Sequence, residues 1–305
     1  MNQSSSINYS IIIPHKNIPE LLARCLNSIP ERGDIQVIVV DDCSDDADTY
    51  LEKYPELTRP DTEVYFTKEG KGAGYARNVG LQHVKGQWVL FADADDFFLP
   101  DWTSIIDPYT NSDADVVQFR IEDVLDHADR MWHNKVLDDY SKGKASARDA
   151  LFSNITCWAK LFNAAFLRKN AILFEEVKCG NDVAFGYQVA VKAQRITISP
   201  SAIYDVTYRN GSLTTIINRE YSWIRYTTVK KANAYAAKHG FLRYELPHAI
   251  EVLKNWRQLG LKDYLFFVWH ERKEICRASK IKMGNKPFNY RHPYLYVLLV
   301  FLKLV

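Results

Sequence analysis

The fold prediction rests on residues 88–96, which read Trp88-Val89-Leu90-Phe91-Ala92-Asp93-Ala94-Asp95-Asp96. The apolar start lacks polar alternation, which is typical of a strand buried on both faces in a parallel sheet. Ligands of such sheets bind beyond the carboxyl ends of the strands, where the three aspartates follow. Crowded carboxylates repel one another unless a cation lies among them, and hard oxygen ligands suit Mg²⁺ or Mn²⁺ with substrate phosphates. The stretch therefore predicts a metal site, the alternative being acids that solvate a loop or cap a helix.

Composition places few limits on function. The chain has 305 residues, of which 47% are hydrophobic and 25% charged, as expected for one large domain or a domain with an appendage. The net charge of +2 does not indicate nucleic acid as a partner. Five scattered cysteines without a Cys-x-x-Cys pair indicate reduced thiols in a cytosolic setting and no zinc cluster. We expect no signal peptide before Ile11 and no membrane-spanning segment.

The first hundred residues alternate between strand and helix patterns. Apolar or β-branched runs predict strands, and helical spacing of apolar residues predicts helices between them. The predicted strands are 9–14, 36–40, 63–67 and 88–92, and the predicted helices are 18–29, 47–54 and 75–83. This alternation predicts an α/β domain with a mostly parallel sheet. The second strand also runs into carboxylates, at Asp41 and Asp42.

Beyond Pro100 the pattern is looser. We expect strands at 115–121, 157–162, 196–198 and 203–208, helices at 101–109, 164–170 and 181–192, and a polar hairpin or loop at 127–139. Val183, Tyr187 and Ala190 have the spacing of an inward helix face. Helix formers and aromatic residues dominate 219–278, with Gly240, Pro247 and Gly260 as breaks. Residues 216–305 are therefore predicted to be a helical C-terminal appendage.

The C-terminal segment combines basic and apolar residues. Between Arg272 and Arg291 there are seven Lys or Arg residues and one Glu, and the apolar run 293–305 follows. That run is too short to span a bilayer, but basic residues beside aromatic and aliphatic ones favour attachment to an anionic membrane surface. The alternatives are a helix that docks on its own domain and a contact in a dimer.

Taken in order, several motifs resemble those of family 2 glycosyltransferases. The motifs are Pro14 with Asn17, the segments 39–45, 74–80 and 86–96, and farther on Trp158-Ala159-Lys160-Leu161-Phe162 and Asn181-Asp182-Val183-Ala184-Phe185. The resemblance covers roughly residues 9 to 215 and implies a GT-A fold, a Rossmann-like mixed sheet flanked by helices, over residues 1–215. Asn181 is a departure, because this family usually has Glu before the Asp.

Some of the implied roles concern the nucleoside. The resemblance implies that Pro14, Asn17 and Asp42 border it, with Asp42 accepting a hydrogen bond from the uracil N3–H of a UDP-sugar. An aspartate can accept this bond where uracil offers a donor. Asp41 is expected to brace its loop rather than to contact the ligand.

Other implied roles concern the diphosphate and the metal. Arg77 would lie near the donor pocket, either against the diphosphate or paired with a carboxylate such as Asp93. Asp93 would face the ribose or the metal, and Asp95 would bind Mn²⁺ or Mg²⁺ directly. Asp96 is expected to serve the metal group or the turn that follows it.

The acceptor side is assigned in the same way. The resemblance implies that Asp182 is the catalytic base, which takes the proton of the acceptor hydroxyl. The alternative is an acid that stabilises the first turn of its helix. Trp158 is interpreted either as an aromatic platform for an acceptor sugar or as a buried core residue.

Together these features predict an inverting, metal-dependent glycosyltransferase. It would move one sugar from a nucleotide-sugar, with UDP as the expected nucleotide, to a saccharide or lipid-linked saccharide at the inner face of the cell membrane. Without a processive-type Gln-x-x-Arg-Trp motif, single addition is favoured over polymer synthesis. The alternatives are a sugar-phosphate nucleotidyltransferase and a non-catalytic nucleotide-sugar-binding protein of the same fold.

Overall fold

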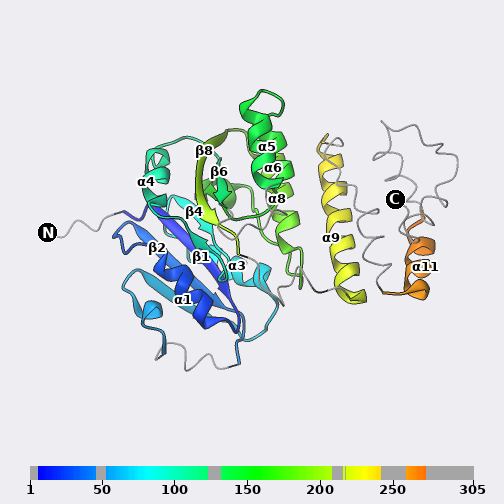
Figure 1. The fold of residues 1–305 in the computed structure, drawn as a ribbon, viewed down its shortest axis with the longest axis horizontal. Coiled ribbons are helices and arrows are strands. Elements are labelled where there is room, and N and C mark those ends of the chain that lie inside the picture. Colours follow the sequence, from blue (N-terminus) through cyan, green and yellow to red (C-terminus); the bar gives the residue numbers. More distant parts are fainter. Residues whose placement is uncertain are drawn as a thin grey trace. The chain divides into compact units, whose positions relative to one another are not determined.

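The structure is a computed structural model that describes residues 6–45, 53–122, 132–207, 216, 218–241 and 259–272. It divides into two compact units, Met1–Arg209 and Asn210–Val305 (Figure 1). This division falls close to the boundary after residue 215 that the sequence predicts. The expected helix at 47–54 lies mostly outside the described residues. The C-terminal segment after Arg272, with most of the basic stretch and the apolar run 293–305, also lies outside them.

The first half of the sheet is parallel. Its strands are β1 (Tyr9–His15), β2 (Ile35–Asp41), β3 (Thr62–Phe66) and β4 (Trp88–Phe91), in the spatial order β3-β2-β1-β4. Every residue of β1, β2 and β4 is buried, as the unbroken apolar runs predict. Because the strands are parallel, their carboxyl ends lie at one edge of the sheet. Asp41 and Asp42 at the end of β2, and the aspartates after β4, lie at this edge.

The second half makes the sheet mixed. Strand β7 (Lys160–Asn163) runs antiparallel to both β4 and β6 (Val116–Glu122), and β8 (Ile196–Asp205) runs parallel to β6. The short β5 (Phe97–Phe98) pairs antiparallel with β8. The eight strands that the structure describes form a single sheet in the order β3-β2-β1-β4-β7-β6-β8-β5. The α/β class with a mixed sheet is thus confirmed.

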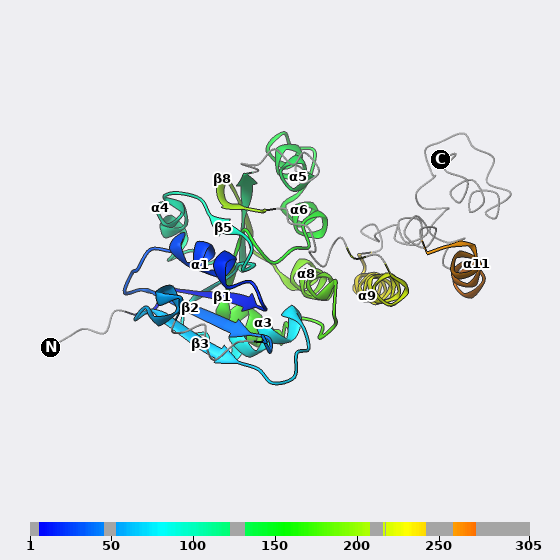
Figure 2. The same cartoon turned by 60° about the horizontal axis from the view of Figure 1, so that its bottom comes forward.

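Helices cover both faces of the sheet (Figure 2). Helix α1 (Pro19–Asn27) places Leu22 and Leu26 in one core cluster with Ile11 and Ile13 of β1. Helix α3 (Ala73–Gln82) packs on the opposite face, where a Cβ at Gly80 would lie 2.6 Å from Ile12 Cγ2. Among the described residues, the other helical elements of this unit are η1 (Pro55–Thr58), α4 (Trp102–Ile106), η2 (Asp107–Tyr109), α5 (Trp132–Ser141), α6 (Ala147–Ser153), α7 (Ala164–Lys169) and α8 (Asn181–Lys192). On α8, the residues predicted to face inward, Val183, Tyr187 and Ala190, are buried.

The prediction of a hairpin or loop at 127–139 is wrong over 132–139, the part that the structure describes, because these residues belong to α5 (Trp132–Ser141). Its buried face includes polar side chains, so no apolar period is visible in the sequence. His133 donates from Nε2 to the Phe119 carbonyl at 3.0 Å, and Asn134 bonds the amide and carbonyl of Ile121. These bonds pair His133 Nε2 and both ends of the Asn134 amide, whereas His133 Nδ1 is buried without a hydrogen-bond partner among the described residues.

Two strands and one helix also differ from the predictions. Strand β8 is one continuous strand rather than two, because it passes through the exposed Pro200 while its pairing with β6 shifts register. Strand β7 begins only at Lys160, after Ala159 adopts a left-handed φ of 53°. Helix α6, which begins with a capping box of Ser146 and Asp149, was not predicted.

The second unit contains α9 (Arg219–Lys238) and α11 (Leu261–His270) among the described residues. Glu271 joins them by accepting hydrogen bonds from Tyr226 Oη at 2.6 Å and from Lys230 Nζ at 2.8 Å. Gly260, with φ of 98°, caps α11, and a left-handed φ of this kind favours glycine. Within the described part of the chain, no helix has the length and apolar character needed to cross a membrane.

Candidate active site

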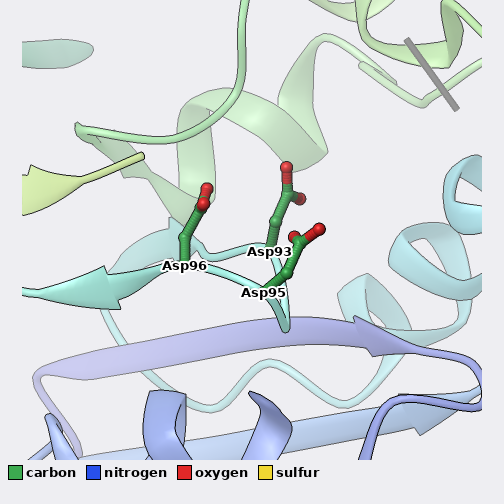
Figure 3. Close-up of side chains that lie close together, drawn as sticks. All are labelled: Asp93, Asp95 and Asp96. Atoms are coloured by element: carbon green, nitrogen blue, oxygen red, sulfur yellow. The ribbon is translucent and has the colours of Figure 1, made fainter. Parts of the chain in front are cut away.

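Three aspartates gather on the turn after β4, and we call residues 93–96 the acid loop. One carboxylate oxygen each of Asp93, Asp95 and Asp96 lies within 4.8 Å of the others. Figure 3 shows the three side chains projecting to the same side of this loop. Asp93 keeps 33% of its side chain exposed, whereas Asp96 is buried. The sequence prediction joined Asp93 and Asp95, and the structure adds Asp96 beside them.

Residues far away in the sequence hold the acid loop in place. The Tyr204 hydroxyl accepts a hydrogen bond from the Asp93 N–H at 2.8 Å, and the Thr207 N–H donates to Asp96 Oδ1 at 2.7 Å. The Asp95 carbonyl accepts from Arg24 of α1 at 2.5 Å and also from the Thr207 hydroxyl. The end of β8 and helix α1 therefore fix the backbone that carries the carboxylates.

The carboxylates of the acid loop suit a divalent cation. Burial raises the pKa of Asp96 well above its usual value, and the charges of Asp93 and Asp95 raise it further. A cation among the three would relieve this repulsion, and carboxylate oxygens are the ligands that Mg²⁺ and Mn²⁺ prefer. The donor set thus fits the metal that the sequence predicts, and Asp93 and Asp95 would be its more exposed ligands.

Arg77 lies in the interior behind the acid loop. Its guanidinium forms an ion pair with Asp93, donates from Nη1 to Asn181 Oδ1 at 2.7 Å and lies 5.2 Å from the ring centroid of Phe174. Burial lowers the pKa of Arg77, but nearby anionic groups including Asp93 and Asp182 outweigh this effect and raise it overall. Of the two positions considered for Arg77, the structure has the pairing with Asp93.

Asp182 lies in the first turn of α8, directly after the Arg77 partner Asn181. Part of its surface is exposed, yet burial is the main reason that its pKa is raised. Arg77 and Lys160 oppose this shift, and Asp93 adds to it. A raised pKa suits a carboxylate that must accept a proton. Buried Lys160 donates to the Thr156 carbonyl at 2.7 Å, and burial lowers its pKa to about 7.

The loops after β1 and β2 form the predicted nucleoside side. Asp42 is buried and accepts from the Gly72 N–H at 2.7 Å and the Thr67 hydroxyl at 3.3 Å. Asn17, with φ of 55°, exchanges hydrogen bonds with Asp45 and so links the two loops.

Pro14 and Asp41 lie near the ends of β1 and β2, just before these loops. Pro14 is buried within β1. Asp41 accepts from the Ser44 N–H and hydroxyl, both at 2.7 Å, and from His15 Nδ1 at 2.8 Å. It therefore braces its loop, as expected.

Trp158 lies in the core rather than on an open surface. It is 8% exposed, and its ring centroid is 5.1 Å from that of His133 and 6.0 Å from that of Tyr204. The structure thus favours the alternative interpretation, a buried core aromatic.

Sequence reasoning missed four residues of this site: Arg24, Lys160, Tyr204 and Thr207. Arg24 and Thr207 act through the Asp95 carbonyl, and backbone contacts of this kind leave no sequence signal. Lys160 did carry a signal, because a lysine inside an apolar strand must be buried or lie at its edge.

The mixed sheet, with the acid loop after β4 and Asp182 in the first turn of α8, has the architecture of a GT-A glycosyltransferase. The chain belongs to glycosyl transferase family 2, whose model matches residues 10–170. It is 30% identical over 300 residues to the poly(ribitol-phosphate) beta-N-acetylglucosaminyltransferase TarS of Staphylococcus aureus, covering 92% of this chain and 48% of that protein. It is 24% identical to the succinoglycan biosynthesis protein ExoO of Rhizobium meliloti, covering 93% and 83% respectively. The chain spans about half the length of the first curated relatives it matches.

Solved structures share the fold. A crystal structure of Staphylococcus aureus TarS residues 1–349 with UDP-GlcNAc matches with a TM-score of 0.61 at 20% identity, covering 98% of this chain and 82% of that one. The mannosyltransferase PcManGT of Pyrobaculum calidifontis, in complex with GDP-Man and Mn²⁺, matches with a TM-score of 0.56 at 16% identity, covering 97% and 86%. The predicted GT-A fold is therefore confirmed.

Proposed function

We propose that this glycosyltransferase is metal-dependent and inverting, and that it moves one sugar from a UDP-sugar to a saccharide or lipid-linked saccharide in cell-surface glycan synthesis. The observation that carries the proposal is the acid loop, whose Asp93 pairs with Arg77, together with Asp182, which lies near enough to both for their charges to affect its pKa. The names of two relatives, a poly(ribitol-phosphate) beta-N-acetylglucosaminyltransferase and a succinoglycan biosynthesis protein, support the surface-glycan assignment.

On the donor side, the loops after β1 and β2 hold the nucleoside. Asp42 accepts from the uracil N3–H while its loop bonds keep the carboxylate fixed, and Pro14 and Asn17 shape the same edge. The structural relatives in complex with UDP and UDP-GlcNAc support UDP as the nucleotide. Bound at Asp93 and Asp95, Mg²⁺ or Mn²⁺ supplies positive charge for the departing diphosphate.

On the acceptor side, Asp182 takes the proton from the attacking hydroxyl. The hydroxyl oxygen forms a bond to the anomeric carbon as the bond from that carbon to the diphosphate oxygen breaks. Because the attack comes from the face opposite the leaving group, the configuration inverts, and an α-linked UDP-sugar gives a β-glycoside. The word "beta" in the name of the Staphylococcus aureus relative supports this outcome.

We further propose that the enzyme works in the cytoplasm, on the inner face of the cell membrane. Three apolar residues of α11 lie four positions apart and thus on one face, with Leu261 54%, Leu265 54% and Trp269 66% exposed. Arg272, 5.5 Å from the Trp269 ring centroid, begins the basic segment. An exposed apolar face followed by basic residues supports binding to an anionic membrane surface.

The test of the proposed chemistry is transfer from UDP-sugars, each supplied with Mn²⁺ and a panel of saccharide acceptors, followed by NMR analysis of the new linkage. We expect a β-glycoside from an α-linked donor, and we expect Asp182→Asn to bind UDP normally while losing transfer by about a hundredfold or more. An α-glycoside from the same donor would contradict the inverting mechanism, and wild-type turnover in Asp182→Asn would reassign the base.

A further inference from the structure

Arg77 connects two elements of the site that are far apart in the sequence. One arm of its guanidinium bonds Asp93 in the acid loop, and the other donates to Asn181 at 2.7 Å. Asn181 is the first residue of α8 and directly precedes Asp182. The side chain from α3 thus bridges the metal-binding loop and the start of the helix that carries the base.

Close packing fixes this bridge. A Cβ at Gly74 would lie 2.4 Å from the Glu175 carbonyl oxygen and 2.8 Å from Asn181 Cβ, so a glycine is needed for α3 to approach the start of α8. Arg77 is 5% and Asn181 7% exposed. The planar guanidinium is held over the Phe174 ring and has little room to turn. A substitution that moves Asn181 therefore shifts the Arg77 guanidinium and its bond to Asp93, and a shift of Asp93 likewise reaches Asn181.

The acceptor at position 181 is neutral. An uncharged amide holds one arm of Arg77 without competing for its charge, which remains directed to Asp93 and, through space, to Asp182. A carboxylate at this position would place a third anion between the two and would raise the pKa of Asp182. Asn181 therefore holds Arg77 by a hydrogen bond without adding a negative charge beside Asp182.

We propose that Asn181 is a positioning residue that, through Arg77, holds Asp182 in register with Asp93 of the acid loop. This inference rests on the proposed function, in which Asp182 is the base and the acid loop binds the metal and the donor. Misplacement of a reacting group by about 1 Å can lower a rate about a hundredfold, so the effect falls on turnover rather than on donor binding.

The experiment compares kcat, the KM for the UDP-sugar and the Kd of UDP with Mn²⁺ in Asn181→Ala, Asn181→Asp and the wild type. We expect Asn181→Ala to lower kcat about tenfold or more and to change KM and Kd by less than about threefold. Asn181→Asp keeps an acceptor for Arg77, so it should recover kcat at alkaline pH, while the acidic limb of its rate profile moves to higher pH.

Asn163→Ala is the matched control. Asn163 also lies at a helix start, where its side chain accepts from the Phe166 N–H at 3.0 Å, but it belongs to no part of the site. It should lower the melting temperature and leave kcat unchanged. Equal kcat losses in Asn163→Ala and Asn181→Ala would show a structural role and overturn the inference.

Two further outcomes separate the inference from the proposed function. A normal kcat in Asn181→Ala, beside an inactive Asp182→Asn, overturns the positioning role alone. An active Asp182→Asn overturns the base assignment and the positioning role with it.

Discussion

The hydroxyl of Tyr204 accepts a hydrogen bond from the backbone N–H of Asp93 at 2.8 Å, although 111 residues separate the two in the sequence. The same tyrosine hydrogen-bonds the Asp96 carboxylate and is fully buried. A residue of β8 thus shapes the acid loop without offering a ligand to the metal.

Tyr204→Phe should weaken metal binding while the fold is kept. Phenylalanine fills the same volume but leaves the Asp93 N–H without its acceptor, and an unsatisfied buried donor costs about 1–3 kcal/mol. We expect the Kd of Mn²⁺ to rise about tenfold in calorimetry. The control is Tyr9→Phe, which removes another buried hydroxyl, bonded to Asp107 and Thr110 away from the site. An unchanged Mn²⁺ affinity in Tyr204→Phe would show that the acid loop does not depend on β8.

A second prediction concerns acid stability and His133. Burial, together with the positive charges of Lys160 and Arg120, lowers the pKa of His133 from the ordinary 6.5 to about 3. Between these pH values the unfolded chain binds a proton that the folded chain excludes. The free energy of unfolding therefore falls as pH drops from 6.5 towards 3, by at most about 1.4 kcal/mol per pH unit.

The measurement is denaturant unfolding of the wild type and His133→Gln at several pH values between neutrality and the range where carboxylates titrate. Glutamine can keep the hydrogen bond to the Phe119 carbonyl, so the variant should lack this part of the pH dependence. The exposed His239→Gln is the control. Parallel pH curves for His133→Gln and the wild type would mean that His133 titrates alike in both states.

Much of the first half of the sheet could be predicted from sequence, because β1, β2 and β4 are mostly apolar and wholly buried, and carboxylates stand at or just after the ends of β2 and β4. The run Trp88–Phe91 leads directly to Asp93, Asp95 and Asp96, and such local order needs no tertiary information. Helix α5 could not be predicted, because its buried face carries His133 and Asn134, whose partners lie on β6.

The site was predictable only where its residues carry chemistry in a local motif. The pairing of Arg77 with Asp93 was one of two alternatives, and a sequence cannot choose between them because the choice depends on where α3 packs. Tyr204 and Thr207 had no signal, since the acid-loop atoms that they contact are distant in the chain.

A third prediction concerns the C-terminal segment. Deletion of the residues after Tyr290, or replacement of Leu265 and Trp269 on α11 by serine, should lower binding to vesicles that contain anionic lipid. The apolar side chains and the basic segment each contribute to surface binding, so either change weakens it. The measurement is co-sedimentation with anionic and with neutral vesicles. The matched control replaces Leu173, which is 51% exposed in the first unit. Undiminished binding by both variants would remove α11 and the tail from any membrane contact.

The most direct test of the central claim is a calorimetric titration of the wild type and Asp95→Asn with UDP, GDP, CDP and dTDP, each with Mn²⁺ and with chelator. We predict selective binding of UDP that requires Mn²⁺ and that weakens about a hundredfold in Asp95→Asn, because the variant loses a charged metal ligand. UDP binding of equal strength with Mn²⁺, with chelator and in Asp95→Asn would contradict a metal-dependent donor site at the acid loop.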